Sequence, residues 1–208
     1  MEITALQRYK GSTFEAELDY ERKIYLHSDI IADFGLRTGM VLERDELRKI
    51  IYASNFRRAY QRALYLLDYR DYSAKEMYDK LIDTYKSEKL CGAVLEKLKG
   101  AGLIDDVRYA GNMARKLVIS KRFGRRRALR ELTMKGIDRF TAEDALEEYD
   151  EMFSENLMEL IEKKYSRYLT DMSDRKNIEK VKSALVRYGY SFDEINRTVR
   201  EYFENMNE

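Results

Sequence analysis

A run of basic residues between positions 121 and 130 holds the side chains best suited to chemistry in this sequence. Its sequence, KRFGRRRALR, contains six positive side chains and no negative one. Lysine and arginine attract anions, and guanidinium groups form paired hydrogen bonds with phosphate and carboxylate oxygens. The run therefore predicts a local anion-binding surface. Its candidate residues are Lys121, Arg122, Arg125, Arg126, Arg127 and Arg130.

Helical spacing separates these arginines into two groups. At about 100° per residue, Arg126, Arg127 and Arg130 lie on one side of a helix. Leu132 lies on the other side, and Arg125 falls beside this apolar surface. An arginine there must extend its charged end to solvent or pair with a carboxylate. We expect the first group to form a solvent-facing strip.

The position of this strip in the first helical turn points to ligand binding. Basic residues there oppose the helix dipole by about 0.3–1 kcal/mol each, so stability alone does not favour them. A helix N-terminus surrounded by arginine binds phosphate or carboxylate instead. The alternative is a solvated face that is neutralised by Glu131 and by the acidic run 143–151.

A second and weaker basic group consists of Arg57 and Arg58, with Arg62 nearby. We include Arg57 and Arg58 among the candidate binding residues, and the alternative is an exposed helix flank. The 17 tyrosines are expected to pack mainly at the boundary of the core, with their hydroxyl groups in water. Stacking on nucleobases is open to a few of them, but the sequence does not select which.

Other candidate groups predict no catalysis. The chain has one histidine, His27, and one cysteine, Cys91, so it lacks a Cys/His zinc set and an internal disulfide. We expect Cys91 in the core. Asp105 and Asp106 suggest a metal-dependent nuclease as one alternative, but we favour a cap for a helix that begins near Val107. We therefore expect a binding protein that is not an enzyme and uses no cofactor or metal.

Opposite charges nearly balance over the 208 residues, with 39 Lys and Arg against 38 Asp and Glu and a net charge of +1. Any electrostatic attraction to nucleic acid must therefore be local. Hydrophobic residues make up 44%, which is enough for a folded core. No run approaches the roughly 18 apolar residues of a membrane span, and the first residues do not resemble a secretion signal. We expect a soluble, cytoplasmic monomer that does not contact membranes.

The first 34 residues alternate apolar and polar side chains, for example from Phe14 to Tyr20. A period of two is typical of a half-buried strand, so we expect a small β-hairpin or three-stranded meander. Ser28 is a candidate cap for a short helix over 29–34. The pattern becomes helical from about residue 43.

Three copies of one helical pattern follow. Leu81, Leu132 and Leu185 occupy equivalent positions at offsets of 51 and 53 residues. Each copy predicts three helices, and stacking of such copies buries a shared face. The fold class is therefore mainly α, an elongated array of three tandem three-helix repeats with a small N-terminal β-hairpin or meander. The expected parts are a β-rich region 1–42, a first repeat with its lead-in helix 43–103, a second repeat 104–152 and a third repeat 153–208.

Capping residues mark helix boundaries within the copies. Pairs of the type Ser/Thr-x-x-Glu/Asp predict helix starts, and glycines predict left-handed residues at helix ends. The first copy has Tyr85 where such a glycine is expected, so its middle helix must end differently. The predicted starts are Ser73 with Glu76, Thr141 with Asp144, and Ser191 with Glu194, and the predicted ends are Gly136 and Gly189.

Three blocks of sequence occur in a characteristic order. The first runs from Ala63 to Leu81, the second is Gly-Leu-Ile-Asp-Asp-x-Arg-Tyr-Ala at 102–110, and the third extends from Gly124 to Ile137. In this order and spacing they resemble the RecX family of bacterial recombinase regulators. The resemblance is strongest over 55–150, and the β-rich start and third repeat resemble the longer members of that family more loosely.

The resemblance implies a fold, a partner and an activity. It implies tandem three-helix units that bind the RecA recombinase filament on single-stranded DNA, within the helical groove of that filament. It also implies inhibition of ATP hydrolysis, strand exchange and co-protease activity in DNA repair, without catalysis by the regulator itself. Single-stranded DNA is then a partner directly or through the filament. The alternative is a stand-alone nucleic-acid-binding module that uses the basic helix from Arg122 to Arg130, although the net charge of +1 favours protein contacts.

Overall fold

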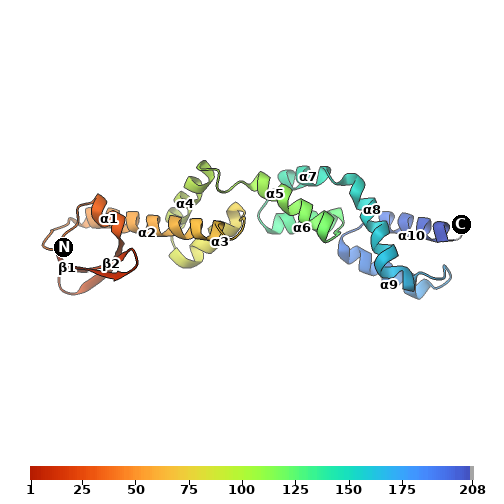
Figure 1. The fold of residues 1–208 in the computed structure, drawn as a ribbon, viewed down its shortest axis with the longest axis horizontal. Coiled ribbons are helices and arrows are strands. Elements are labelled where there is room, and N and C mark those ends of the chain that lie inside the picture. The colour runs from red at the N-terminus through yellow and green to blue at the C-terminus, as the bar shows by residue number, and fades with distance from the viewer. Residues whose placement is uncertain (207–208) are drawn as a thin grey trace. The chain divides into compact units, whose positions relative to one another are not determined.

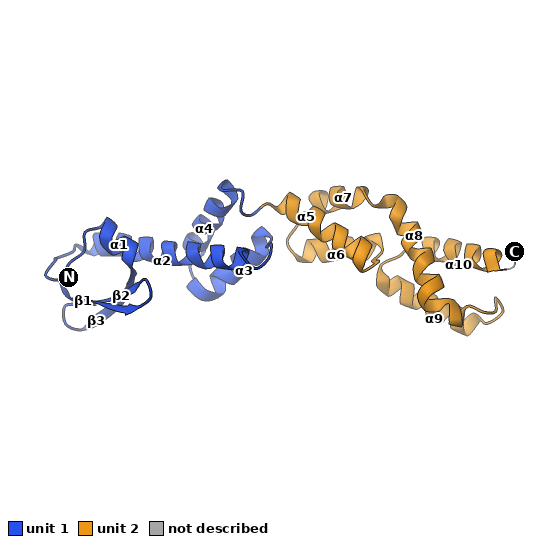
Figure 2. Cartoon of the chain, viewed as in Figure 1, with its two compact units in different colours: residues 1–104 blue, residues 105–208 orange. Residues whose placement is uncertain are grey.

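The computed structural model describes residues 1–206, which divide into two compact units. The first unit comprises residues 1–104 and the second begins at Asp105 (Figure 2). Each unit has hydrophobic core residues of its own.

A three-stranded antiparallel sheet opens the first unit, with strand order β1-β2-β3 (Figures 1 and 2). This confirms the predicted meander. Leu18 and Leu26 are buried on the face of the sheet that packs against the following helices, as the alternation of side chains along a strand requires. The strands are β1 (Ile3–Lys10), β2 (Thr13–Leu18) and β3 (Arg22–His27).

The short helix α1 (Ser28–Asp33) follows the sheet, but its cap differs from the prediction. The imidazole Nδ1 of His27 accepts a hydrogen bond from the backbone amide of Asp29, at 3.1 Å. Ser28 is instead the first residue of the helix. The prediction that Ser28 caps the helix is therefore wrong, because a histidine at the end of β3 supplies the acceptor one residue earlier.

The long helix α2 (Arg44–Leu67) connects the sheet to the first repeat. Leu47 and Ile50, in its N-terminal half, belong to the core beneath the sheet. Ala59 and Ala63, in its C-terminal half, belong to the core that it shares with the next two helices. Small side chains there allow helices to approach closely. The other helices of this repeat are α3 (Ala74–Tyr85) and α4 (Glu88–Gly100).

The described part of the second unit, residues 105–206, contains six α-helices (Figure 1). They pack around one continuous core. Buried residues from Ala110 to Phe203 belong to a single cluster, so the second and third repeats share their core. The helices are α5 (Asp106–Arg115), α6 (Arg125–Met134), α7 (Arg139–Glu147), α8 (Asp150–Leu160), α9 (Arg175–Tyr188) and α10 (Phe192–Met206). A π-helical turn, η1 (Lys116–Ser120), extends α5. A π-helical turn, η2 (Ile161–Tyr165), and a 3-10 turn, η3 (Ser166–Tyr168), extend α8.

The repeat register predicted from leucine spacing agrees with the structure. Leu81, Leu132 and Leu185 lie in α3, α6 and α9, the second helix of each repeat, and all three are fully buried. Cys91 is also buried, as predicted. Within residues 1–206, no helix is long and apolar enough to cross a membrane.

Two of the three predicted helix starts are confirmed. The backbone amide of Glu76 donates to Ser73 Oγ at 3.1 Å, and Ser191 and Glu194 form a reciprocal capping box. The third prediction is wrong, because α7 begins earlier and Asp138 accepts from the amide of Thr141 at 3.0 Å. Thr141 therefore lies inside the first turn of the helix that it was expected to cap.

Positive φ angles mark the predicted helix ends. Gly136 and Gly189 have φ values of 85° and 98°, in the left-handed region that glycine adopts most easily. In the first repeat Lys86 takes this conformation, with φ of 50°, directly after Tyr85. Asp105 caps α5 as predicted, since its Oδ1 accepts from the amides of Val107 and Arg108, both at 3.0 Å.

Candidate functional site

The N-terminus of α6 abuts the C-terminus of α9, so the predicted basic run lies where the second repeat meets the third. The amide of Gly124 donates to the carbonyl oxygen of Tyr188 at 2.9 Å, and the amide of Arg126 donates to that of Gly189 at 3.2 Å. A Cβ atom on Gly124 would lie 2.5 Å from the carbonyl carbon of Gly189. The two backbones are therefore in direct contact, with no room for a side chain at Gly124.

This contact engages backbone amides at the start of α6. The amides of Gly124 and Arg126 are occupied by carbonyl oxygens of α9, so they offer no free anion site there. The negative end of the α9 dipole also faces the positive end of α6, which is favourable. Arg127 Nη1 donates to the carbonyl oxygen of Arg187 at 2.9 Å. The expected dipole penalty of these arginines is therefore offset by the carbonyl groups that end α9.

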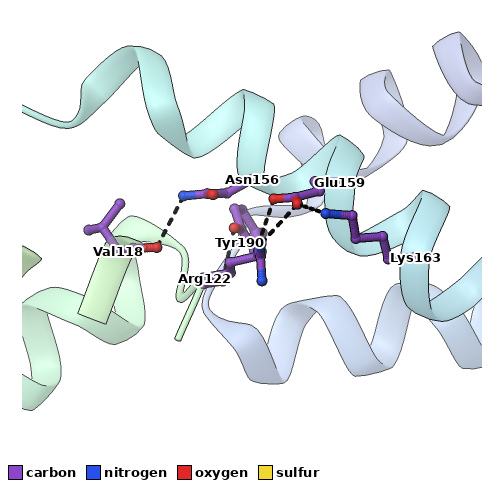
Figure 3. A network of polar contacts seen from close by, with 6 residues as sticks. All are labelled: Val118, Arg122, Asn156, Glu159, Lys163 and Tyr190. Carbon is purple, nitrogen blue, oxygen red and sulfur yellow. Dashed lines mark hydrogen bonds and ion pairs between the residues drawn. The ribbon is translucent and has the colours of Figure 1, made fainter. Parts of the chain in front are cut away.

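Arg122 anchors the second repeat to the first helix of the third (Figure 3). Its Nε and Nη2 atoms donate to the two carboxylate oxygens of Glu159, at 2.6 and 2.8 Å. Lys163 also bonds to Glu159. Hydrogen bonds from Arg122, and then from Lys163, hold the pKa of the Glu159 carboxyl below its usual value. The charge of Arg122 is therefore paired inside the chain.

Two further hydrogen bonds reinforce this contact between repeats (Figure 3). The buried Asn156 donates from Nδ2 to the carbonyl oxygen of Val118 at 3.2 Å. The hydroxyl of Tyr190 donates to the carbonyl oxygen of Arg122 at 3.0 Å, and burial raises the pKa of that hydroxyl. Both side chains satisfy carbonyl groups next to helix ends, which stabilises the arrangement of the two repeats.

Arg125 and Arg127 also have partners within the chain. Arg125 forms an ion pair with Asp150, which confirms that an arginine at the edge of the apolar face must pair or reach solvent. The guanidinium carbon of Arg127 lies 3.7 Å from the centroid of the Phe123 ring, in cation–π geometry. Three of the predicted binding arginines, Arg122, Arg125 and Arg127, thus contribute to the junction itself.

Arg126 and Arg130 are exposed and line a hollow of about 490 Å³ between α6 and α9. Neither side chain forms an ion pair with a carboxylate within residues 1–206. We call this space the arginine hollow, because four guanidinium groups contribute to its lining. It is lined by Arg126, Arg127, Arg130, Val186, Arg187, Gly189 and Tyr190.

A second basic hollow, of about 290 Å³, lies on the same junction. Lys164 Nζ donates to the hydroxyl of Tyr188 at 2.6 Å, and the Tyr188 ring packs edge-on against Phe123. We call this space the lysine hollow. Glu159 contributes a carboxylate to its lining. It is lined by Ser120, Lys121, Arg122, Glu159, Leu160, Lys163, Lys164 and Tyr188.

Three basic residues of these hollows, Lys163, Lys164 and Arg187, were not predicted. They belong to the third repeat, outside the run of basic residues around α6. The approach of α9 to α6 brings Arg187 near Arg126, and the packing of α8 against η1 brings Lys163 and Lys164 near Lys121. The two glycines that permit this approach, Gly124 and Gly189, are the sequence feature from which the contact could have been suspected.

Arg57 and Arg58 lie in the first unit, on α2, and are not part of this junction. Arg57 Nη2 pairs with Asp29 Oδ2 at 2.7 Å, which connects α2 to α1. Arg58 is half-buried. The predicted site residues therefore fall into two separate groups.

The fold defines an α-helical repeat protein with a small antiparallel sheet and a basic junction between two of its repeats. Family models match all three repeats: RecX, first three-helix domain, over residues 59–98; RecX, second three-helix domain, over 105–146; and RecX, third three-helix domain, over 150–199. The chain belongs to the RecX family.

Individual relatives agree with this assignment. The regulatory protein RecX of Geobacillus thermodenitrificans is 31% identical over 83% of this chain, which spans 64% of that relative's length. The regulatory protein RecX of Clostridium acetobutylicum is 28% identical, with 97% of this chain and 95% of that protein covered. These names support a regulatory role for the chain.

Solved structures show the same fold. The crystal structure of RecX from Lactobacillus salivarius is 33% identical, covers 72% of this chain and 97% of its own, and superposes with a TM-score of 0.65. A crystal structure of a regulatory protein RecX superposes with a TM-score of 0.72 at 24% identity, and covers 96% and 98% of the two chains. The latter similarity concerns the fold alone.

Proposed function

We propose that this protein binds the RecA filament on single-stranded DNA and inhibits its ATPase, strand-exchange and co-protease activities. Membership of the RecX family supports a regulatory role, and the basic junction supports a polyanionic partner. The observation that carries the proposal is the concentration of cations in the arginine hollow of a chain whose net charge is only +1. Such a local field attracts an anion without making the whole surface basic.

The arginine hollow suits an oxyanion. Arg126 and Arg130 come from the second repeat and Arg187 from the third, so their guanidinium groups converge from two elements. Guanidinium groups bind phosphate and carboxylate oxygens through paired hydrogen bonds. In a RecA filament, the phosphates of the DNA strand and the acidic side chains of the recombinase are the two sources of such groups.

ATP hydrolysis by RecA on single-stranded DNA tests the function directly. We expect the protein to slow hydrolysis at substoichiometric amounts, because one bound regulator blocks several neighbouring protomers in a filament. Sedimentation of filaments should carry the protein into the pellet. Unchanged hydrolysis together with no co-sedimentation would contradict the proposal.

Charge reversal tests the arginine hollow. We expect Arg126→Glu with Arg130→Glu to reduce filament binding at least tenfold at moderate salt, since two favourable phosphate or carboxylate contacts become repulsive. Arg115→Glu with Lys116→Glu is the matched control, because both residues are exposed in the same repeat outside either hollow. Equal losses for the two double variants would show that net charge acts rather than this surface.

A stand-alone nucleic-acid-binding module is the second candidate function, and the four arginines of the hollow favour it. It requires DNA binding without RecA, with an affinity that falls steeply as salt rises. Binding of a labelled single strand at several salt concentrations separates the two functions. If the arginine hollow acts only within the filament, the Arg126→Glu, Arg130→Glu variant binds the strand without RecA as well as the parent does.

A further inference from the structure

A pair of exposed tyrosines lies at the C-terminal end of α2, in the first unit. Tyr65 is 50% exposed and Tyr69 is 71% exposed. Their ring centroids are 4.9 Å apart in an edge-to-face arrangement, and the Tyr69 hydroxyl donates to the Tyr65 hydroxyl at 2.8 Å. The pair is thus held in a defined geometry while most of its aromatic surface remains in water.

Two arginines continue this surface along α2. Arg58, Arg62 and Tyr65 are spaced by four and three residues, which places them along one side of α2. Tyr69 follows in the turn after the helix and contacts Tyr65. The guanidinium carbon of Arg62 lies 5.3 Å from the Tyr65 ring centroid. We call these four residues the α2 stripe.

The charges around the α2 stripe are mainly positive. Arg58 and Arg62 form no ion pair with a carboxylate in the described part of the chain. Both are close enough to Tyr85 to oppose the increase in its pKa that burial causes. Asp68 is the carboxylate beside Tyr69. The α2 stripe therefore carries two guanidinium groups, those of Arg58 and Arg62, against the single carboxylate of Asp68 that acts on Tyr69.

A second tyrosine pair in the same unit provides a contrast. Tyr9 and Tyr25, on the sheet, have ring centroids 5.0 Å apart and are 63% and 41% exposed. The Tyr25 hydroxyl donates to a carboxylate oxygen of Glu15 at 3.1 Å, and no cation of the described residues lies over either ring. The two pairs have similar geometry, but of the two only the α2 pair has an arginine over one of its rings.

We propose that the α2 stripe binds single-stranded nucleic acid by stacking bases on Tyr65 and Tyr69 while Arg58 and Arg62 contact the backbone phosphates. Aromatic rings bind any base through its π-face, and arginine adds both phosphate binding and cation–π attraction. An unstacked single strand supplies both groups together, whereas an acidic protein segment supplies only the negative charge. The site goes beyond the filament proposal, because it lies outside the basic junction and requires no RecA.

Fluorescence tests this site without interference, because the chain contains no tryptophan. A Tyr69→Trp variant places one indole in the α2 stripe, and Tyr9→Trp places one in the matched pair on the sheet. Each full-length variant is titrated with a thymidine oligonucleotide and with an abasic strand of equal length. We expect the oligonucleotide to quench the emission of the first variant at least twofold more than that of the second, and the abasic strand to quench neither.

Affinity measurements with ring substitutions complete the test. We expect Tyr65→Ala with Tyr69→Ala to weaken oligonucleotide binding about fivefold or more, the equivalent of about 1 kcal/mol of stacking. Tyr65→Phe with Tyr69→Phe should retain affinity, since the rings remain. Circular dichroism checks that each variant keeps the helical content of the parent.

Several outcomes overturn the proposal. Equal quenching of the two reporters, quenching by the abasic strand, or quenching by polyglutamate but not by the oligonucleotide would each show that no base stacks on α2. Equal loss in the alanine and phenylalanine variants would do the same. The Arg126→Glu, Arg130→Glu variant should keep the quenching at α2, so a failure of the junction and a failure of the α2 stripe are distinguishable.

Discussion

The second helices of the first two repeats begin at equivalent positions but are capped in different ways. In α3, Ser73 Oγ accepts from the amide of Glu76, within the same repeat. In α6 the corresponding residue is Gly124, and the helix has no side-chain cap. Its amides instead donate to carbonyl oxygens of α9 in the third repeat. The first helix start is therefore local, whereas the second depends on a neighbouring repeat.

This difference explains why the second and third repeats form one compact unit. A repeat protein is stabilised by each repeat and by the interface between neighbours. At this interface the backbones of Gly124 and Gly189 touch, and one core cluster runs through both repeats. The same contact gathers arginines from α6 and α9 into one hollow. Stability and the candidate site thus arise from a single contact.

The largest loss of stability is expected when Gly124 is replaced by serine, the residue that caps α3. Gly124→Ser supplies a favoured capping residue at φ of −68°, but its Cβ would lie 2.5–2.6 Å from backbone atoms of Gly189 and Tyr190. We expect the second unit to lose more than about 3 kcal/mol of unfolding free energy, because backbone atoms must move. Urea denaturation followed by circular dichroism measures the loss.

Gly111→Ser is the control for this substitution. Gly111 lies in α5 of the same unit, and a Cβ there meets no atom within 4 Å. We expect a change within about 0.5 kcal/mol, because serine is at least as favourable as glycine inside a helix. If Gly124→Ser is as stable as this control, the close backbone contact between Gly124 and Gly189 does not contribute to the stability of the second unit.

A smaller effect is expected at the local cap. Ser73→Ala removes the side-chain acceptor for the Glu76 amide, and loss of an N-cap typically destabilises by about 1 kcal/mol. The loss should appear in the transition of the first unit, since α3 belongs to residues 1–104. Hydrogen exchange shows which helix is destabilised, and we expect the α3 amides to exchange faster in the variant. Faster exchange in α6 rather than α3 would contradict the proposed independence of the two helix starts.

The smallest effect is expected from Glu159, and it depends on pH. Hydrogen bonds from Arg122 and Lys163 lower the pKa of this carboxyl from 4.5, so its charged form favours the folded state. The stabilisation is present above pH 4.5 and is lost as the pH falls through the lower folded-state pKa. We expect the stability difference between the parent and Glu159→Gln to be constant near neutral pH and to shrink in acid.

Glu162→Gln is the matched control for this pH dependence. Glu162 is exposed in the turn that extends α8, and it lies three residues from Glu159. Its substitution should not reproduce the acid-dependent change expected of Glu159→Gln, because Arg122 donates both of its hydrogen bonds to Glu159. A stability difference for Glu159→Gln that grows as the pH falls would reverse the sign assigned to Glu159.

Local sequence patterns predicted the parts of the fold that depend on neighbouring residues. The alternation after residue 13 predicted the meander, and the leucine spacing predicted the repeats. Two caps were assigned to the wrong residue. His27 replaces Ser28 and Asp138 replaces Thr141, because several residues near each helix start carry suitable acceptors and only the backbone path selects one.

By itself the sequence determined the three-helix repeats, the buried leucines and the existence of a basic surface around α6. Those features follow from periodicity and from charge close together along the chain. Only the tertiary structure decided which arginines bind inside the chain and which face the hollow. That division depends on α8, which supplies Glu159 and Asp150. It also depends on the approach of α9 to α6, more than 50 residues away along the chain, where Gly124 and Gly189 leave no side chain between the backbones.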